Sequence, residues 1–393
     1  MSQKLVNLNA DLSKLRDEGY EMDVKNGYLL ISNIPYVNSN KEVAFGTLIS
    51  VLDISGSKVL KPLTHVALFV GDFPCNKDGT PIEGIRHCDY SQILFDSVKP
   101  NYSFSNKPAA GYSDYYEKMT RYIEIISAPA RSLCPEVTPK TFKRLETAEE
   151  DSVFNYYDTN SSRSKINAIS DKLKNHKIAI IGLGGTGSYV LDLVAKAPVS
   201  EIHLYDGDMF AQHNAFRAPG APTIEQLEAT YPKVEYFTDI YSKMHRGICP
   251  HAAFITDKNK NELLKLDFVF VCVDSGKAKR LILPLLISNG IPFVDVGMGV
   301  YERCGGLVAS IRTTSFVSNK SDFIGNVISY EDAEEDEYTT NIQIADLNML
   351  NASFAVIKWK KLLGVYIDTV KEYNNVYSSD WNQLINQCDE TNS

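Results

Sequence analysis

The sequence predicts an α/β protein in which a mostly parallel sheet, with helices between its strands, follows a smaller α+β domain. The chain has 393 residues, more than a single small module needs, because domains commonly hold about 100–200 residues. After residue 177 the apolar runs are short and continuous, as is typical of strands covered on both faces. Before residue 150 turn residues separate the apolar runs, which is typical of a mixed α+β module.

The composition is that of a globular chain. Hydrophobic residues make up 44% and charged residues 23% of the sequence, which excludes disorder or a coiled coil as a global description. The 40 Lys and Arg residues against 49 Asp and Glu give a formal net charge of −9. The chain therefore lacks the positive field that would hold a nucleic-acid backbone or an anionic membrane non-specifically. We expect neither nucleic acid nor a membrane among its partners.

The first residues and the cysteines indicate the cytoplasm. The start lacks the long apolar core of a signal peptide, and no stretch approaches the roughly 20 apolar residues that span a bilayer. The seven cysteines form no Cys-x-x-Cys pair, so the sequence predicts neither a zinc site nor a disulfide framework.

Residues 1–150 are expected to form the α+β domain. Apolar runs at 28–32, 46–52 and 65–70 predict strands. An opening helix is predicted from Leu8, Leu12 and Leu15, whose spacings place them on one face. The sequence turns polar between residues 138 and 170, which is typical of an interdomain connection. The boundary is therefore expected near residue 150, with residues 151–393 as the second domain.

A glycine-rich motif follows the first continuous apolar run of the second domain. It places Gly182, Gly184, Gly185 and Gly187 between a strand and a helix, where backbone N–H groups can approach phosphates. Asp206 lies nineteen residues after Gly187, at the end of the next apolar run, where a carboxylate can bind ribose hydroxyls. Together these residues predict a Rossmann-like sheet that binds an adenine nucleotide.

The residues after Asp206 favour ATP over NAD. Asp208, Asn214 and Arg217 add polar and charged groups that hydride transfer does not need. Reaction at an α-phosphate builds charge on the phosphate oxygens and on pyrophosphate, so it needs cationic donors and a metal held by carboxylates.

This half of the chain resembles the ThiF/MoeB/HesA family of adenylyltransferases, whose eukaryotic members are the ubiquitin-activating enzymes. The family carries G-x-G-G-x-G, D-x-D, N-x-x-R, a later Lys and an Asp after a following strand, and all five occur here in order. The resemblance implies ATP as cofactor, with Mg²⁺. It implies that Asp206 binds the ribose, with Asp208 nearby, and that Asn214 and Arg217 face the phosphates. It further implies that Lys243 stabilises the α-phosphate and that Asp274 binds Mg²⁺.

Two of these assignments have alternatives, and the resemblance points to one further residue. Lys243 lies farther from Arg217 than is usual in the family, and Lys233 or Arg246 could take its place. Asp274 could instead cap the helix predicted to start near residue 275. Family members often supply a second arginine, to the partner subunit's ATP site, from the helix before the glycine-rich strand. Arg163 is the candidate here, and that role would require a homodimer.

The sequence departs from the family where the activated acyl group is received. Family members often have a catalytic cysteine in a crossover loop, but the corresponding segment, 312–341, contains none. The enzyme could release the acyl-adenylate directly to another protein or a small nucleophile. Otherwise the acceptor could be a hydroxyl or a more distant thiol. These candidates are Thr313, Thr314, Ser315, Ser318 and Cys304.

A helix is predicted after this segment. Leu347, Leu350, Phe354 and Ile357 recur at helical spacing, and the helix is expected to end near Gly364.

The amino-terminal domain resembles the domain that precedes such adenylating domains in bacterial ubiquitin-like conjugation operons, through the motifs at 104–108, 111–116 and 158–163. We expect it to dock a ubiquitin-like protein or a conjugating enzyme. Its reactive residue types, His65, Cys75, His87 and Cys88, are each interpreted as structural.

The expected function is ATP-dependent adenylation of a carboxylate, the C-terminal glycine of a ubiquitin-like protein, for transfer to a conjugating-enzyme-like protein or another acceptor. An NAD(P)-dependent oxidoreductase would explain the glycine-rich motif and Asp206 equally well, but not the charged residues. A non-catalytic nucleotide sensor is a third hypothesis, and adenylation of a tRNA base or a small acid remains open.

Overall fold

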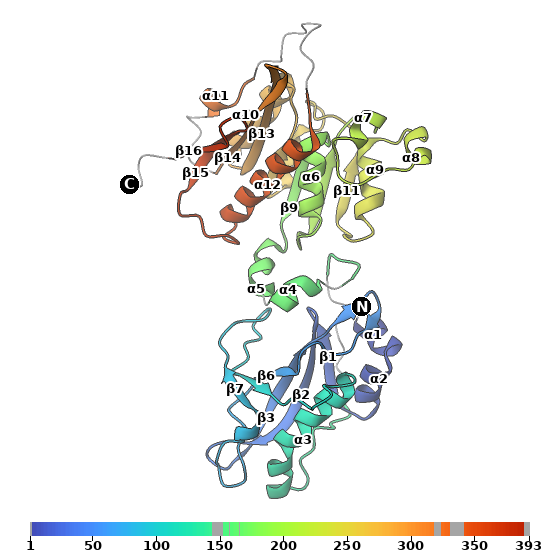
Figure 1. The fold of residues 1–393 in the computed structure, drawn as a ribbon, viewed down its shortest axis with the longest axis vertical. Helices are drawn as coiled ribbons and strands as arrows, with labels where there is room; N and C mark the ends of the chain where they lie inside the picture. Colours follow the sequence, from blue (N-terminus) through green and yellow to red (C-terminus); the bar gives the residue numbers. More distant parts are fainter. Residues whose placement is uncertain are drawn as a thin grey trace. The chain divides into compact units, whose positions relative to one another are not determined.

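The computed structural model describes residues 2–143, 152–156, 158–164, 166–317, 324–330 and 342–388. The chain divides into two compact units, Met1–Asp171 and Lys172–Ser393, here called unit 1 and unit 2 (Figure 1). The units meet later in the sequence than the boundary expected near residue 150.

Unit 1 is built on a six-stranded antiparallel sheet with the order β1-β2-β3-β6-β8-β7. Its strands are β1 (Glu21–Lys25), β2 (Tyr28–Val37), β3 (Val43–Val51), β6 (Val66–Val70), β7 (Arg86–Asp89) and β8 (Tyr102–Ser105), and β4 (Ile54–Ser55) pairs separately with β5 (Lys58–Val59). Its helical segments are α1 (Ser2–Leu8), α2 (Ala10–Asp17), η1 (Glu83–Ile85), α3 (Tyr115–Leu133), α4 (Thr159–Ser164) and α5 (Asn167–Ser170), and η2 (Asp171–Leu173) spans the join with unit 2.

The opening helix is interrupted at Asn9, where a single helix was predicted. Asn9 has extended backbone angles, and its Nδ2 donates to the carbonyls of Leu5 and Ser57 while its Oδ1 accepts from the N–H of Val59. These hydrogen bonds tie the break to β5. Leu12 is fully buried as predicted, whereas Leu8 lies exposed before the break.

Unit 2 contains an eight-stranded sheet with the order β11-β10-β9-β12-β13-β14-β15-β16. The strands are β9 (Lys177–Ile181), β10 (Glu201–Tyr205), β11 (Ile248–His251), β12 (Phe268–Val271), β13 (Phe293–Arg303), β14 (Gly306–Phe316), β15 (Glu372–Ser378) and β16 (Gln383–Cys388). Pairing is parallel from β11 through β13 and antiparallel from β13 to β16. The predicted α/β class is therefore confirmed, with an antiparallel extension that the sequence did not predict.

Helices cover both faces of this sheet. Alternate residues of β9, such as Ile178 and Ile180, pack with α6, α9 and α12, while Ala179 and Ile181 pack with α10 on the other face. The helical segments of unit 2 are α6 (Gly185–Val194), α7 (Gln212–Ala215), α8 (Ile224–Glu228), α9 (Lys233–Tyr241), η3 (Lys260–Lys265), α10 (Gly276–Ser288), α11 (Ile324–Val327) and α12 (Ala345–Leu362). The buried parallel strands explain the continuous apolar runs in the sequence.

The predicted crossover segment begins later than expected. Residues 312–316 belong to β14 and pair with β13 and β15, so the segment between strand and helix starts after Phe316.

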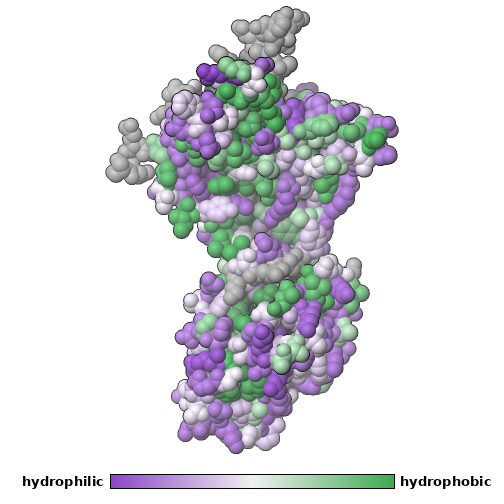
Figure 2. Space-filling view, viewed as in Figure 1, coloured by the Kyte–Doolittle hydropathy of each residue, from purple (hydrophilic) through white to green (hydrophobic). Residues whose placement is uncertain are grey.

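Within the described residues, no helix combines the length and apolar character needed to cross a membrane. Figure 2 shows polar side chains spread over the visible face of each unit, with apolar patches between them.

Candidate functional site

A cavity of about 1090 Å³ in unit 2 contains most of the residues predicted to bind the nucleotide and its metal. It lies where β9, β10 and β12 end, which is the edge at which open parallel sheets bind ligands. The residues on which the site depends are Gly182, Gly184, Gly185, Asp206, Asp208, Arg217, Lys233, Asp274, Lys279, Arg312 and Asn348, all of which line the cavity.

The glycine-rich loop joins β9 to α6 and leaves no room for a side chain at Gly185 or Gly187. Gly182 has φ +88°, a left-handed conformation that favours glycine. A Cβ on Gly187 would lie 1.8 Å from the carbonyl oxygen of Gly182, and one on Gly185 would lie 2.1 Å from Nδ2 of Asn348. Gly187 does not line the cavity; its role is to allow the first turn of α6 to lie close to Gly182. The unpaired N–H groups of the first turn of α6 consequently lie at the cavity edge, a favourable place for an anion.

Asp206 is the most tightly held carboxylate at the end of β10. Its side chain is 5% exposed, Oδ2 accepts the N–H of Leu183 at 2.6 Å, and Oδ1 accepts the N–H of Asp208 at 2.8 Å. Asp206 thus fixes both the glycine-rich loop and the loop that follows β10.

Lys233 lines this cavity, whereas Lys243 does not. Its Nζ lies 2.7 Å from Oδ2 of Asp208 and 3.7 Å from Oδ1 of Asp206, and its side chain is 8% exposed. Lys243 is paired with Asp239 at 3.1 Å, both side chains are exposed, and Lys243 does not line the cavity. Lys233 is the first residue of α9, at the cavity. Lys243 follows ten residues later, which corresponds to about 15 Å along a helix axis. The structure therefore places Lys233, the alternative already considered, at the cavity and Lys243 outside it.

Of the two residues predicted to face the phosphates, Arg217 lines the cavity and Asn214 does not. Arg217 lines the cavity, and within the described residues its buried Nε has no hydrogen-bond partner. Asn214 is buried in α7 and does not line the cavity; its Oδ1 accepts the N–H of Ala211 at 2.9 Å, and its carbonyl accepts the N–H of Arg217 at 3.1 Å. Asn214 therefore positions the turn that carries Arg217, and Arg217 offers a donor to a ligand.

Asp274 lies at the cavity and does not serve as the cap of α10. The hydroxyl of Ser275 accepts the N–H of Ala278 at 3.3 Å and caps the helix instead. Asp274 is exposed at the end of β12, where its carboxylate can offer oxygen ligands to a cation in the cavity.

A buried group of three charges was missed from the sequence. Asp295 is fully buried on β13, with Lys279 Nζ 2.8 Å from Oδ1 and Arg312 Nη2 2.5 Å from Oδ2. Lys279 and Arg312 both line the cavity. Asp295 interrupts the apolar run 292–296 near the start of β13, and a charged residue within a run expected to be buried on both faces was the available signal.

Asn348 of α12 is a further cavity residue that the sequence did not indicate. Its Oδ1 accepts the hydroxyl of Thr186 at 2.9 Å, beside the glycine-rich loop, and its buried Nδ2 has no hydrogen-bond partner among the described residues. The predicted apolar face of this helix did not include it, because Asn348 lies one position away from Leu347.

The candidate hydroxyl acceptors are buried in β14. Thr313, Thr314 and Ser315 are at most 4% exposed. Their hydroxyls lie 3.4 Å from Asn351 Oδ1, 2.7 Å from Asn374 Oδ1 and 3.3 Å from the carbonyl of Tyr373. None of these three hydroxyls is placed to receive an acyl group. Ser318 lies outside the described residues.

Two cysteines of unit 2 contrast in exposure. Cys304 is exposed at the turn between β13 and β14. Cys272 lines the cavity, but burial raises the pKa of its thiol, which disfavours the nucleophilic thiolate.

The remaining candidates lie in unit 1. Arg163 belongs to α4, and its role at a partner's site stays a prediction. Cys75 is buried, and His65 Nε2 lies 3.1 Å from the hydroxyl of Ser105, in agreement with structural roles. Cys88 is exposed on β7, with Sγ 2.9 Å from the hydroxyl of Ser103, which also lies 2.9 Å from Nδ1 of His87.

Several curated proteins resemble part of the chain. It is 25% identical over 134 residues to the tRNA threonylcarbamoyladenosine dehydratase of Haemophilus influenzae, covering 32% of this chain and 49% of that protein. It is 24% identical over 144 residues to the adenylyltransferase and sulfurtransferase UBA4 of Yarrowia lipolytica, covering 34% and 35%. It is 22% identical over 157 residues to the ubiquitin-like modifier-activating enzyme 5 of Drosophila mojavensis, covering 37% and 39%. The chain spans about half or less of the length of these relatives.

Solved structures and family models give two further comparisons. Escherichia coli MccB with MccA-N7isoASN aligns at 20% identity and a TM-score of 0.46, over 58% of this chain and 71% of that one. PaaA aligns at 17% identity and a TM-score of 0.45, over 56% and 75%. Residues 10–159 match a domain of unknown function (DUF6791), and residues 151–378 match the ThiF family. Since the second match covers more than half of the sequence, the chain belongs to the ThiF family.

Proposed function

We propose that this chain activates a carboxylate by ATP-dependent adenylation in the cavity of unit 2. The observation that carries the proposal is the convergence of the glycine-rich loop with Asp206 and the cations Arg217 and Lys233 on one cavity. Relatives named as adenylyltransferases and as a modifier-activating enzyme support the same reaction class.

Each group has a position suited to one part of ATP. The N–H groups at the start of α6 would bind phosphate oxygens, because a helix N-terminus attracts anions. Asp206 lies at the end of β10, the position at which a carboxylate can bind the ribose hydroxyls. Arg217 Nε and Asn348 Nδ2 are buried donors whose missing hydrogen bonds a phosphate or ribose oxygen would supply.

In the reaction, the substrate carboxylate attacks the α-phosphorus, a new bond to the carboxylate oxygen forms, and the bond to pyrophosphate breaks. Negative charge then grows on the α-phosphate oxygens and on the leaving pyrophosphate. Lys233 and Arg217 stabilise this charge from fixed positions, and removing one such group typically costs about 10²–10³-fold in rate. The buried Asp295 orients Lys279 and Arg312 at the same cavity.

A magnesium ion fits the donors at the end of β12. Asp274 offers an exposed carboxylate at the cavity, and carboxylate oxygens are ligands that Mg²⁺ prefers. When bound, the ion would neutralise charge on the triphosphate.

The proposed substrate is the C-terminal glycine of a ubiquitin-like protein, with a conjugating-enzyme-like protein as the receiving partner. The printed names of the UBA4 and modifier-activating relatives support this class of substrate. Because Thr313, Thr314 and Ser315 are buried, we favour direct transfer of the acyl group from the acyl-adenylate to a second protein. The exposed Cys304 is the alternative acceptor within the chain. We propose that the chain works as a homodimer in the cytoplasm, where ATP is available.

A binding experiment separates this proposal from an NAD-dependent reaction. The full chain is titrated calorimetrically with NAD⁺ and with Mg²⁺ and AMPCPP, an ATP analogue that cannot be cleaved between the α- and β-phosphates. We expect AMPCPP to bind to the unmodified chain and to bind at least tenfold more weakly to Arg217→Ala. Lys243→Ala, which changes an exposed side chain, should bind AMPCPP as the unmodified chain does. Binding of NAD⁺ without binding of AMPCPP would overturn the proposal.

Catalysis is tested by ATP–pyrophosphate exchange. The substrate in this assay is a ubiquitin-like protein that ends in glycine, sought among the proteins encoded beside the gene. We expect exchange to need that protein with its terminal glycine intact. AMPCPP binding without any exchange would favour the nucleotide-sensor hypothesis instead.

A further inference from the structure

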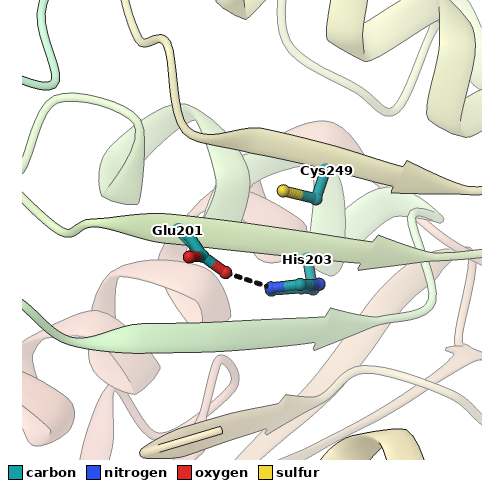
Figure 3. Close-up of side chains that lie close together, drawn as sticks. All are labelled: Glu201, His203 and Cys249. Carbon is teal, nitrogen blue, oxygen red and sulfur yellow. Dashed lines mark hydrogen bonds and ion pairs between the residues drawn. The ribbon is translucent and has the colours of Figure 1, made fainter. Parts of the chain in front are cut away.

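A group of three potential metal ligands lies on β10 and β11, at one side of the eight-stranded sheet. Glu201 and His203 are two residues apart on β10, so they lie on the same face of the strand. Cys249 of β11 is the register partner of His203 in the parallel pairing. Figure 3 shows the three side chains on these neighbouring strands. Pairing within a rigid sheet therefore brings together residues from distant parts of the sequence.

The distances within this group suit one shared ion. One ligand atom from each of the three residues lies within 4.8 Å of the other two. Nε2 of His203 is 2.9 Å from Oε2 of Glu201 (Figure 3). Zinc binds imidazole nitrogen, thiolate sulfur and carboxylate oxygen at about 2.0–2.3 Å, so neighbouring ligand atoms about 3–4 Å apart can surround it with small side-chain movements.

The surroundings hold these ligands in place. Nδ1 of His203 lies 3.0 Å from Nε2 of His251, which leaves Nε2 of His203 directed toward Glu201. Lys177 Nζ binds Oε1 of Glu201 at 2.7 Å, so Oε2 is the oxygen that faces His203. Partners of this kind fix the ring orientation and tautomer of a histidine ligand.

We propose that Glu201, His203 and Cys249 bind one Zn²⁺ ion, with a water molecule in the fourth position. On binding, the ion releases to water the proton of the Cys249 thiol and the proton between Nε2 of His203 and Oε2 of Glu201, while Nδ1 of His203 keeps the proton that it donates to Nε2 of His251, so the imidazole is neutral. The thiolate and the carboxylate together balance its charge. A combination of nitrogen, oxygen and sulfur donors favours this borderline-soft ion over Mg²⁺ or Ca²⁺.

The proposed site has one cysteine, one histidine and one glutamate, whereas the zinc sites typical of Cys-x-x-Cys pairs use several cysteines. Glu201 begins β10, whereas the nucleotide cavity lies beyond its end, about 16 Å along a strand of this length. The ion would therefore join the edge strand β11 to β10 and take no part in the chemistry of the cavity. A stacked contact continues toward the cavity, because the ring of His251 lies 4.2 Å from that of Tyr205, a cavity residue.

Cobalt spectroscopy tests the proposal. The full chain, freed of metal with a chelator, is titrated with Co²⁺, which gives a thiolate-to-metal charge-transfer band in the near ultraviolet when a cysteine binds it. We expect one equivalent to produce this band and one equivalent of Zn²⁺ to remove it. The band should disappear in Cys249→Ser and persist in Cys304→Ser, which changes an exposed cysteine elsewhere in unit 2.

A second variant guards against a folding defect. Glu201→Gln keeps the size of the side chain and should weaken Co²⁺ binding at least tenfold while the circular dichroism spectrum stays unchanged. No band in the unmodified chain, or an equal band in Cys249→Ser, would overturn the proposal.

Discussion

Oδ2 of Asp206 accepts the backbone N–H of Leu183 at 2.6 Å, and this hydrogen bond ties the end of β10 to the glycine-rich loop after β9. Oδ1 of the same carboxylate accepts the N–H of Asp208 and lies 3.7 Å from Lys233 Nζ. One buried side chain thus positions the loop, Asp208 and Lys233.

Replacing Asp206 by Asn should weaken nucleotide binding. Hydrogen bonds that involve a charged group contribute about 1.5–3 kcal/mol, and 1.4 kcal/mol corresponds to a factor of ten in affinity. We therefore expect the dissociation constant for AMPCPP with Mg²⁺, measured by calorimetry, to rise at least tenfold. Asp239→Asn, at an exposed ion pair, is the matched control. An unchanged constant in Asp206→Asn would show that the loop holds its conformation without the carboxylate.

Lys233 and Lys243 give opposite expectations. Lys233→Met removes a nearly buried cation from the cavity and should lower ATP–pyrophosphate exchange about 100-fold. Lys243→Met changes an exposed ion pair and should leave the rate within about twofold. The reverse result, with Lys243→Met inactive, would restore the assignment implied by the family resemblance.

Gly187→Ala should destabilise unit 2. Its Cβ would lie 1.8 Å from a backbone carbonyl oxygen that cannot move as a side chain would. Overpacking typically costs about 1–3 kcal/mol, and a clash with backbone places this substitution at the upper end of that range. A Cβ on Gly184 would meet nothing within 4 Å, so Gly184→Ala should unfold like the unmodified chain. Urea denaturation of both variants measures the difference, and equal midpoints would contradict the close approach of α6 to the loop.

Buried His245 should make unit 2 sensitive to acid. Burial lowers its pKa from 6.5 to about 4, although carbonyl oxygens of Val199 and Ala197 partly oppose the shift. The unfolded chain therefore binds a proton below pH 6.5 that the folded chain does not. The stability contribution is complete above pH 6.5 and is lost as the pH falls toward 4, by about 2 kcal/mol at pH 5.

The measurement is urea denaturation at pH 7 and pH 5. His245→Gln keeps a donor and an acceptor and should lose less stability between the two pH values than the unmodified chain. His213→Gln, at an exposed histidine, should behave like the unmodified chain. If His245→Gln loses as much stability as the unmodified chain, the acid sensitivity has another source.

Local sequence patterns predicted the parallel part of the fold and the residues next to strand ends. Strands buried on both faces give continuous apolar runs, and ligand residues follow such strands. This is why the glycine-rich loop, Asp206 and Asp274 were found. β15 and β16 were missed because their polar, partly exposed residues show no comparable run.

The unpredicted site residues depend on packing between distant segments. Lys233 and Lys243 could be separated only once α9 was known to begin at Lys233. Asn348 belongs to the buried face of α12, whereas the apolar pattern placed Leu347 and Ile357 there; Ile357 is in fact 41% exposed. A buried polar residue such as Asn348 does not show in hydrophobic periodicity.

Ser275, which caps α10, makes it possible to test the chemistry of the adjacent Asp274 without disturbing the fold. Because the hydroxyl of Ser275 satisfies the helix start, an isosteric amide at position 274 would leave the helix intact. An inactive Asp274→Asn protein with normal thermal unfolding would then report the loss of a negative charge at the reaction centre rather than damage to the scaffold.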